Sequence, residues 1–158
     1  MECDINANME WSIKNLKTFI GMEGQGFNVS LYEGNKLVAF VIDDARGGPL
    51  MFQWKDKTAK DRLNALVASL PPVGFEGTNL KTAVTADIFV GDLVWDLQNK
   101  LEDKRYERKL QKDCQTKTCF LLPGESVKDG WRILKTPFSA KAVAFLQGKY
   151  PGATILNT

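Results

Sequence analysis

The sequence predicts an α+β fold: a mainly antiparallel sheet built from hairpins, with three helices packed on it, one of them long. Three observations support this prediction. In residues 27–32 and 50–54, apolar residues alternate with polar ones, as in strands that are buried on one face. From about residue 58, apolar residues recur at helical spacing instead. Short turn sequences join the predicted strands, and such connections are typical of antiparallel neighbours.

The N-terminal half is predicted to contain four strands. Residues 1–10 form a polar lead-in, and residues 11–20 form the first strand. Residues 27–32 alternate with a period of two, and a Glu-Gly-Asn turn connects them to residues 36–42 as a hairpin. A Gly-Gly-Pro break follows, and the alternation of residues 50–54 then predicts a further strand.

A first helix is predicted after this strand. Thr58 is a suitable N-cap, and Asp61 three residues later completes a pattern like that of a capping box. The apolar residues that share one helical face are Ala59, Leu63, Leu66, Val67 and Leu70. Two prolines end the helix, and residues 71–82 are expected to form a loop rich in glycine and proline.

The C-terminal half is predicted to contain a long helix over residues 84–112, with Gly91 leaving open whether it is one helix or two. Residues 119–122 and 131–134 then form a second hairpin. Thr136 or Ser139 caps a last helix, and Gly148 is expected just after its end. The residues expected to be buried on this helix are Phe138, Ala142, Phe145 and Leu146.

Composition places the chain among ordinary globular proteins, with 44% hydrophobic and 25% charged residues in 158. We expect one domain over residues 11–158. The net charge of +2 is too small to indicate nucleic acid or membrane binding by itself. No apolar run approaches the roughly 20 residues of a membrane-spanning helix, and the acidic N-terminus lacks the pattern of a secretory signal. Three cysteines favour a reducing compartment, so we expect a cytoplasmic protein with no membrane partner.

Several reaction classes are disfavoured by the residues present. The chain has no histidine, which excludes Ser-His-Asp and Cys-His nucleophile arrangements. Cys114 and Cys119 have the wrong spacing for a zinc knuckle, and no phosphate-binding loop motif occurs. Asp43 and Asp44 are adjacent, so in a strand their side chains point to opposite faces. We therefore expect no catalytic residues, no metal site and no cofactor.

The segment between the third and fourth strands is the first candidate site. Glycine permits positive φ and proline removes a backbone donor, so this segment interrupts a strand ladder. One interpretation is a loop that only reverses the chain. The other is a binding site in which an arginine and free amides face a phosphate or carboxylate, with aromatic rings of the returning strand as a stacking wall. Its candidate residues are Asp43, Asp44, Arg46, Gly47, Gly48 and Trp54.

The long helix carries the second candidate site. Val90, Val94, Leu97 and Leu101 lie on one line at 100° per residue. Beyond Leu101 the same side becomes basic and continues as Lys104, Arg105, Arg108, Lys109 and Lys112. This basic stripe would suit an acidic protein surface or nucleic-acid phosphates. The alternative is a solvated helix end, with Trp95, Tyr106 and Leu110 packing on the other side.

Residues 10–54 resemble the N-terminal part of small uncharacterised proteins encoded by tailed bacteriophages. The matching residues are Asp43, Asp44, Gly47, Gly48, Phe52 and Trp54. The resemblance implies an accessory viral protein in a bacterial cytosol that works by stoichiometric binding. It implies no catalytic residues.

Three functional hypotheses follow. The first is a non-enzymatic binding protein that contacts its partner through the basic stripe and the Arg46 loop. With the bacteriophage resemblance, its partner would be a host or anti-phage defence protein that it inhibits. The second is a nucleotide-binding protein that sequesters a signalling nucleotide at the Arg46 loop. The third is a nucleic-acid-binding accessory protein.

Overall fold

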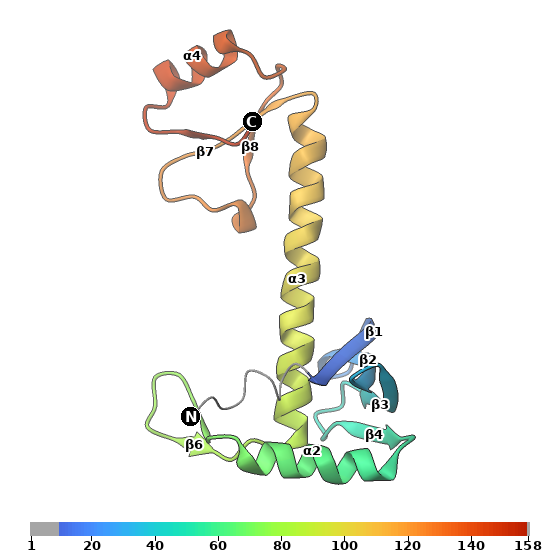
Figure 1. The fold of residues 1–158 in the computed structure, drawn as a ribbon. Helices are drawn as coiled ribbons and strands as arrows, with labels where there is room; N and C mark the ends of the chain where they lie inside the picture. The colour runs from blue at the N-terminus through green and yellow to red at the C-terminus, as the bar shows by residue number, and fades with distance from the viewer. Residues whose placement is uncertain (1–9, 158) are drawn as a thin grey trace. The chain divides into compact units, whose positions relative to one another are not determined.

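The computed structural model describes residues 10–157 and confirms the α+β class (Figure 1). Within this range the strands pair antiparallel, and three α-helices occur, one of them long. The chain divides into two compact units, the first ending at Asp96 and the second beginning at Leu97. The elements, labelled as in Figure 1, are β1 (Trp11–Gly21), β2 (Gly24–Glu33), β3 (Lys36–Asp43), β4 (Met51–Trp54), α2 (Lys57–Ser69), β5 (Val73–Gly74), β6 (Lys81–Thr82), α3 (Ala86–Cys114), β7 (Thr118–Leu121), the 3₁₀ helix η1 (Val127–Asp129), β8 (Arg132–Leu134), α4 (Ala140–Lys149) and β9 (Thr154–Ile155).

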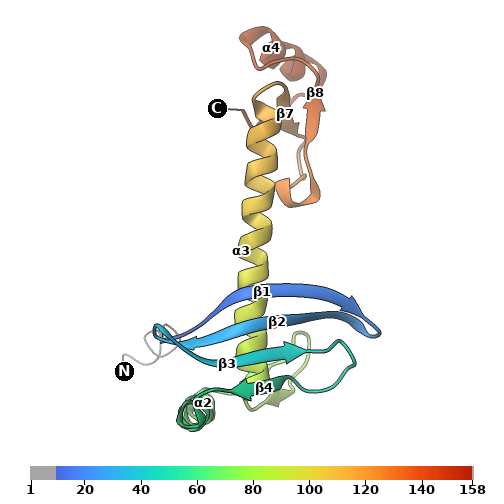
Figure 2. The same ribbon diagram turned by 90° about the vertical axis from the view of Figure 1, so that its right-hand side faces the viewer.

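The first unit contains a four-stranded antiparallel sheet in the order β1-β2-β3-β4 (Figure 2). The four strands that the sequence predicted are therefore confirmed. β1 contains a bulge, because its pairing with β2 shifts between Lys14 and Lys17. Asn15, inside the bulge, has a φ of 58°, a conformation that asparagine adopts more readily than most residues.

One face of this sheet forms the hydrophobic core with α2 and the first turns of α3. From the sheet, Leu31, Val38 and Val41 are fully buried. Opposite them lie Leu63 of α2 and Val90 of α3, also fully buried. The other face of the sheet, here called the outer face, has no helix of the core cluster packed on it.

Helix α2 begins one residue after Asp56, which is its N-cap. The prediction of Thr58 as N-cap was wrong. The carboxylate of Asp56 accepts hydrogen bonds from the amides of Thr58 and Ala59, and an ionised carboxylate is a strong acceptor at this position. Thr58 donates its hydroxyl to the same Asp56 oxygen at 2.6 Å. It therefore supports the cap instead of forming it.

The segment expected to be a loop between α2 and α3 contains a short hairpin. Residues 71–82 include β5 and β6, which pair through Val73 with Thr82 and Gly74 with Lys81. The prediction of a loop without strands was therefore wrong for these four residues.

Helix α3 is continuous through Gly91, so the long helix is one helix and lies two residues later than predicted. Val90 and Val94 of the predicted apolar line are buried, whereas Leu101 is half exposed. The alternative interpretation of this helix expected Trp95 to be packed, but its side chain is 65% exposed.

The second unit contains a three-stranded sheet with β7 between β8 and β9. The predicted hairpin of β7 and β8 is confirmed, with Cys119 opposite Ile133. The buried side chain of Asn157 ties this sheet together: it accepts from the amide of Cys119 at 2.6 Å and donates to the carbonyls of Cys114 and Lys117.

Helix α4 is capped by Ser139, one of the two predicted caps. Ala142 and Leu146 are buried as expected, but Phe138 and Phe145 are about half exposed. A residue adjacent to Leu146 lies about 100° from it around the helix, so Phe145 falls outside the buried face of Ala142 and Leu146.

Gly148 lies inside α4, so its predicted place after the helix end was wrong. Lys149 is the last residue of the helix, and Tyr150 is its C-cap. The glycine with positive φ that follows α4 is Gly152, at 85°.

Replacing a core leucine of α2 should lower stability strongly. Leu63→Ala removes a fully buried side chain and should cost about 2–5 kcal/mol of unfolding free energy. Leu66→Ala, at a half-buried position of the same helix, should cost clearly less. Urea unfolding of both variants measures the difference. Equal losses would contradict the assigned face of α2.

The Asp56 carboxylate should make stability depend on acid pH. Hydrogen bonds from the Thr58 side chain and then from the Lys36 ammonium group hold the pKa of Asp56 well below its usual range. A carboxyl whose folded pKa is lowered stabilises the fold above its unfolded pKa of roughly 4, and this contribution is lost as pH falls through the folded pKa. Asp56→Asn should therefore be less stable than the parent above roughly pH 4, and the gap should shrink in more acidic buffer. Unfolding free energies measured across this pH range would contradict the assignment if the gap were constant.

Candidate functional site

The two aspartates of the first candidate site cap their own turns. Asp43 Oδ1 accepts a hydrogen bond from the Ala45 amide at 2.9 Å, and Asp44 Oδ1 accepts one from the Arg46 amide at 3.1 Å. Each side chain thus bonds the backbone two residues ahead, as aspartate does in tight turns. The two carboxylates hold the chain reversal after β3.

The loop is also anchored to its neighbours. Ala45 is buried with a φ of 58°, and its carbonyl accepts from the Glu23 amide at 2.9 Å in the turn between β1 and β2. At the other end of the loop, the Leu50 amide donates to Asp87 Oδ2 of α3 at 2.8 Å. The loop is therefore built into the first unit on both sides.

A carboxylate lies against the first of the two loop glycines. Gly47 has a φ of 77°, and the carboxylate of Glu23 lies directly against it, in the place where a Cβ would be. Asp43 and Asp44 are nearby in the same turn. Arg46 is exposed, and its side chain forms no ion pair within residues 10–157. The carboxylates disfavour an anionic ligand here, so the binding role of the loop stays a prediction.

The aromatic residues of β4 pack inward. The rings of Phe52 and Trp54 are nearly parallel, with centroids 5.5 Å apart, and both are half-buried against the core. The predicted stacking wall is thus already occupied by the two rings and the core.

The basic stripe of α3 lies in the second unit and is exposed at all five positions. Two of its members contact rings of their own unit: Arg105 lies 5.8 Å from the Tyr106 ring, and Lys109 lies 5.6 Å from the Trp131 ring. The other three are Lys104, Arg108 and Lys112, spaced four residues apart. None of these three forms an ion pair with another described residue.

The opposite side of α3 is covered by the loop before β8. Trp131 meets Tyr106 edge to face at 6.4 Å and donates its indole N–H to Asp113 at 3.0 Å. Lys128 and Asp103 approach to 3.6 Å on this side as well. Tyr106 is therefore packed, as the alternative interpretation of this helix expected. The contacts of the second unit leave the line of Lys104, Arg108 and Lys112 uncovered.

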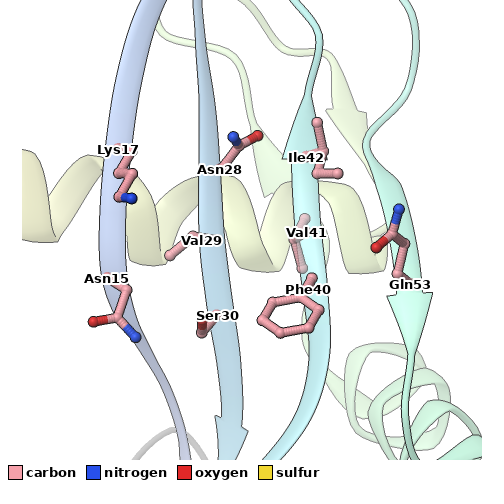
Figure 3. A pocket seen from close by; sticks show the side chains of 9 residues that line it. All are labelled: Asn15, Lys17, Asn28, Val29, Ser30, Phe40, Val41, Ile42 and Gln53. Carbon is pink, nitrogen blue, oxygen red and sulfur yellow. The ribbon is translucent and has the colours of Figure 1, made fainter.

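The outer face of the four-stranded sheet carries a site that the sequence did not reveal. A hollow of about 300 Å³ crosses this face (Figure 3). Its polar and aromatic lining comes from all four strands, with a row of side chains running across the sheet. These residues are Asn15, Lys17, Asn28, Ser30, Phe40 and Gln53.

Three lysines lie on or beside this face. Lys14 lies over the ring of Tyr32 at 4.6 Å, Lys55 lies over the ring of Phe40 at 5.0 Å, and Lys17 lines the hollow. Six cross-strand pairs around the hollow face outward, and none contains a carboxylate. They are Lys14–Ser30, Lys17–Asn28, Asn28–Ile42, Ser30–Phe40, Phe40–Gln53 and Ile42–Met51. The outer face is therefore cationic.

The alternation of β2 already held the signal for this face. Asn28, Ser30 and Tyr32 alternate with the apolar residues Phe27, Val29 and Leu31 of the same strand. The alternation predicted a strand buried on one face but no function for its other face. Which residues of β1, β3 and β4 lie beside them depends on cross-strand register, and the bulge in β1 hides that register in the sequence.

The cysteines do not form a metal site in the described part of the chain. Cys119 is fully buried. Burial is the main cause that raises the pKa of its thiol to about 12, and the contact with Cys114 is the second, so the thiol stays protonated. Cys3 lies outside the described residues. No group of three or more metal-binding side chains occurs within residues 10–157.

Alanine substitution should destabilise the protein at Gly47, where φ is positive, but not at Gly48, where the surroundings leave room for a methyl group. Gly47→Ala forces a non-glycine residue into positive φ, so it should cost about 1–2 kcal/mol, while the flexible Glu23 side chain can move away from the new methyl group. Gly48→Ala meets no atom within 4 Å and should change stability by less than about 0.5 kcal/mol. Thermal or urea unfolding checks both values. A neutral Gly47→Ala would contradict the described loop.

Comparisons with known proteins leave the geometry as the basis for function. No protein-family model, curated protein or solved structure matches this chain. Among the described helices, none combines the length and apolar character needed to cross a membrane.

Proposed function

We propose that this protein is a non-enzymatic binding protein that acts by stoichiometric association with an acidic partner protein. The proposed contact is the line of Lys104, Arg108 and Lys112 on α3, called here the cationic line. The partner that the proposal favours is a host or anti-phage defence protein, which the binding would inhibit. The resemblance of residues 10–54 to bacteriophage accessory proteins supports this choice of partner.

The observation that carries the proposal is the spacing of like charges on an uncovered helix side. Lys100, Lys104, Arg108 and Lys112 follow one another at four-residue intervals, and all are exposed. Like charges at this spacing destabilise a helix by roughly 0.2–0.5 kcal/mol per pair. No described carboxylate pairs with these four side chains. An acidic partner surface would turn this repulsion into attraction.

The residues that precede the cationic line favour a protein over a nucleic-acid duplex. Leu97 is half-buried and Leu101 is 50% exposed on the same side of α3. The line itself carries no aromatic ring, since Tyr106 and Trp131 pack on the opposite side. An exposed leucine next to basic residues suits a protein interface, where apolar contacts and charged groups occur together.

The test is capture of partners from a nuclease-treated bacterial lysate by the tagged protein, followed by mass spectrometry and a binding measurement with the purified partner. Reversal of the line in Lys104→Glu/Arg108→Glu/Lys112→Glu should abolish binding. Glutamate is a strong helix former, so α3 should persist in this variant.

The matched control is Lys57→Glu/Lys60→Glu/Lys141→Glu, which changes the net charge equally at exposed lysines elsewhere. Its binding should be preserved at moderate salt. A partner that binds both variants equally well would remove the cationic line from the proposal. A partner lost on nuclease treatment would exclude direct protein binding.

A further inference from the structure

We propose that the outer face of the four-stranded sheet binds single-stranded nucleic acid. This face belongs to the first unit and is separate from the cationic line. The two proposals therefore rest on different residues and can fail independently.

Charge is the first support. Lys14, Lys17 and Lys55 are distributed over β1 and the end of β4, and the outward-facing residue pairs contain no aspartate or glutamate. A second copy of this face would bring lysines against lysines, which disfavours self-association. The face is thus complementary to an anionic ligand.

The rings supply the second support. Phe40 is 36% exposed on β3, and Tyr32 is partly exposed on the neighbouring β2. Each ring has a lysine ammonium group within 5.0 Å. The flexible lysine stems allow the ammonium groups to move from ring to phosphate. A base stacked on either ring would then keep its phosphate beside a cation, which is the combination that single strands require.

The polar side chains around the hollow supply the third support. Asn28, Ser30 and Gln53 line the hollow beside Phe40 (Figure 3). The amide groups of Asn28 and Gln53 form no side-chain hydrogen bond with another residue of the described chain. Such groups can donate to and accept from the exposed edges of unpaired bases. In a duplex these edges are paired and the bases are stacked on each other, so the face should prefer single strands.

The first experiment measures fluorescence anisotropy of a labelled oligo(dT) of about 12 nucleotides, within the roughly 4–16 nucleotides that single-strand-binding sheets cover. The full chain should bind it at low salt. Three lysine contacts predict that log affinity falls with log salt with a slope of about −2, at about 0.7 per contact. A duplex of the same length should bind at least several-fold more weakly.

The variants separate stacking from charge. Phe40→Ala should weaken oligo(dT) binding roughly 5- to 150-fold, the range of one lost stacking contact. Phe40→Leu keeps the apolar volume and should show most of the same loss. Lys17→Glu should weaken binding and flatten the salt dependence. The matched control Lys60→Glu, on the exposed side of α2, should leave both unchanged.

Four outcomes would overturn the proposal: no binding of oligo(dT) at low salt, full binding by Phe40→Leu, equal loss in Lys60→Glu and Lys17→Glu, or displacement by polyglutamate at the same charge concentration as oligo(dT). The last outcome would point to an acidic protein as the ligand of this face. The variant with the cationic line reversed should bind oligo(dT) normally. The oligo(dT) measurement therefore tests the outer face even if the cationic line binds no protein partner.

Discussion

The packing of one sheet face against α2 and the start of α3 is the constraint on which the first unit depends. An antiparallel sheet can be stable with a single buried face, provided that this face is apolar throughout. Trp11, Leu31 and Val41 of this face meet that condition, with relative exposures of 4% or less. The outer face carries no comparable packing requirement. Core packing therefore does not require lysines and aromatic rings on the outer face. A cationic surface at this place supports a role in binding.

The sequence was sufficient for elements whose signals are local. Alternation in residues 27–32 and the turn at Gly34 specify β2, β3 and their hairpin through neighbouring residues alone. Helix α3 was predicted for the same reason. Details that depend on competition between neighbours were not predictable. Asp56 and Thr58 are both good caps, and only the packed position of Ala59 and Leu63 decides where α2 begins.

The candidate sites also differ in how far the sequence could reveal them. The basic stripe was visible because helical periodicity places residues on one side without reference to the rest of the fold. The environment of the loop after β3 was not visible, because Glu23 and Asp87 reach it from other parts of the chain. The outer sheet face needed the register of four strands at once. Long-range pairing of this kind leaves no spacing pattern in the sequence.

The bulge at Asn15 changes which residues of β1 face the core, from odd-numbered to even-numbered positions. Before it, Ile13 faces the core opposite Leu31; after it, Lys17 lies opposite Asn28 and Leu16 packs against the core. If β1 paired with β2 in one unbroken register, Lys17 would lie opposite the buried Phe27 and Leu16 would lie opposite Asn28, on the outer face. The bulge thus keeps Ile13 and Leu16 on the core face, although regular alternation places residues three apart on opposite faces. Deletion of Asn15 would let Leu16 pair with Val29 while Lys17 stays opposite Asn28, so a β1 without the bulge would keep both faces.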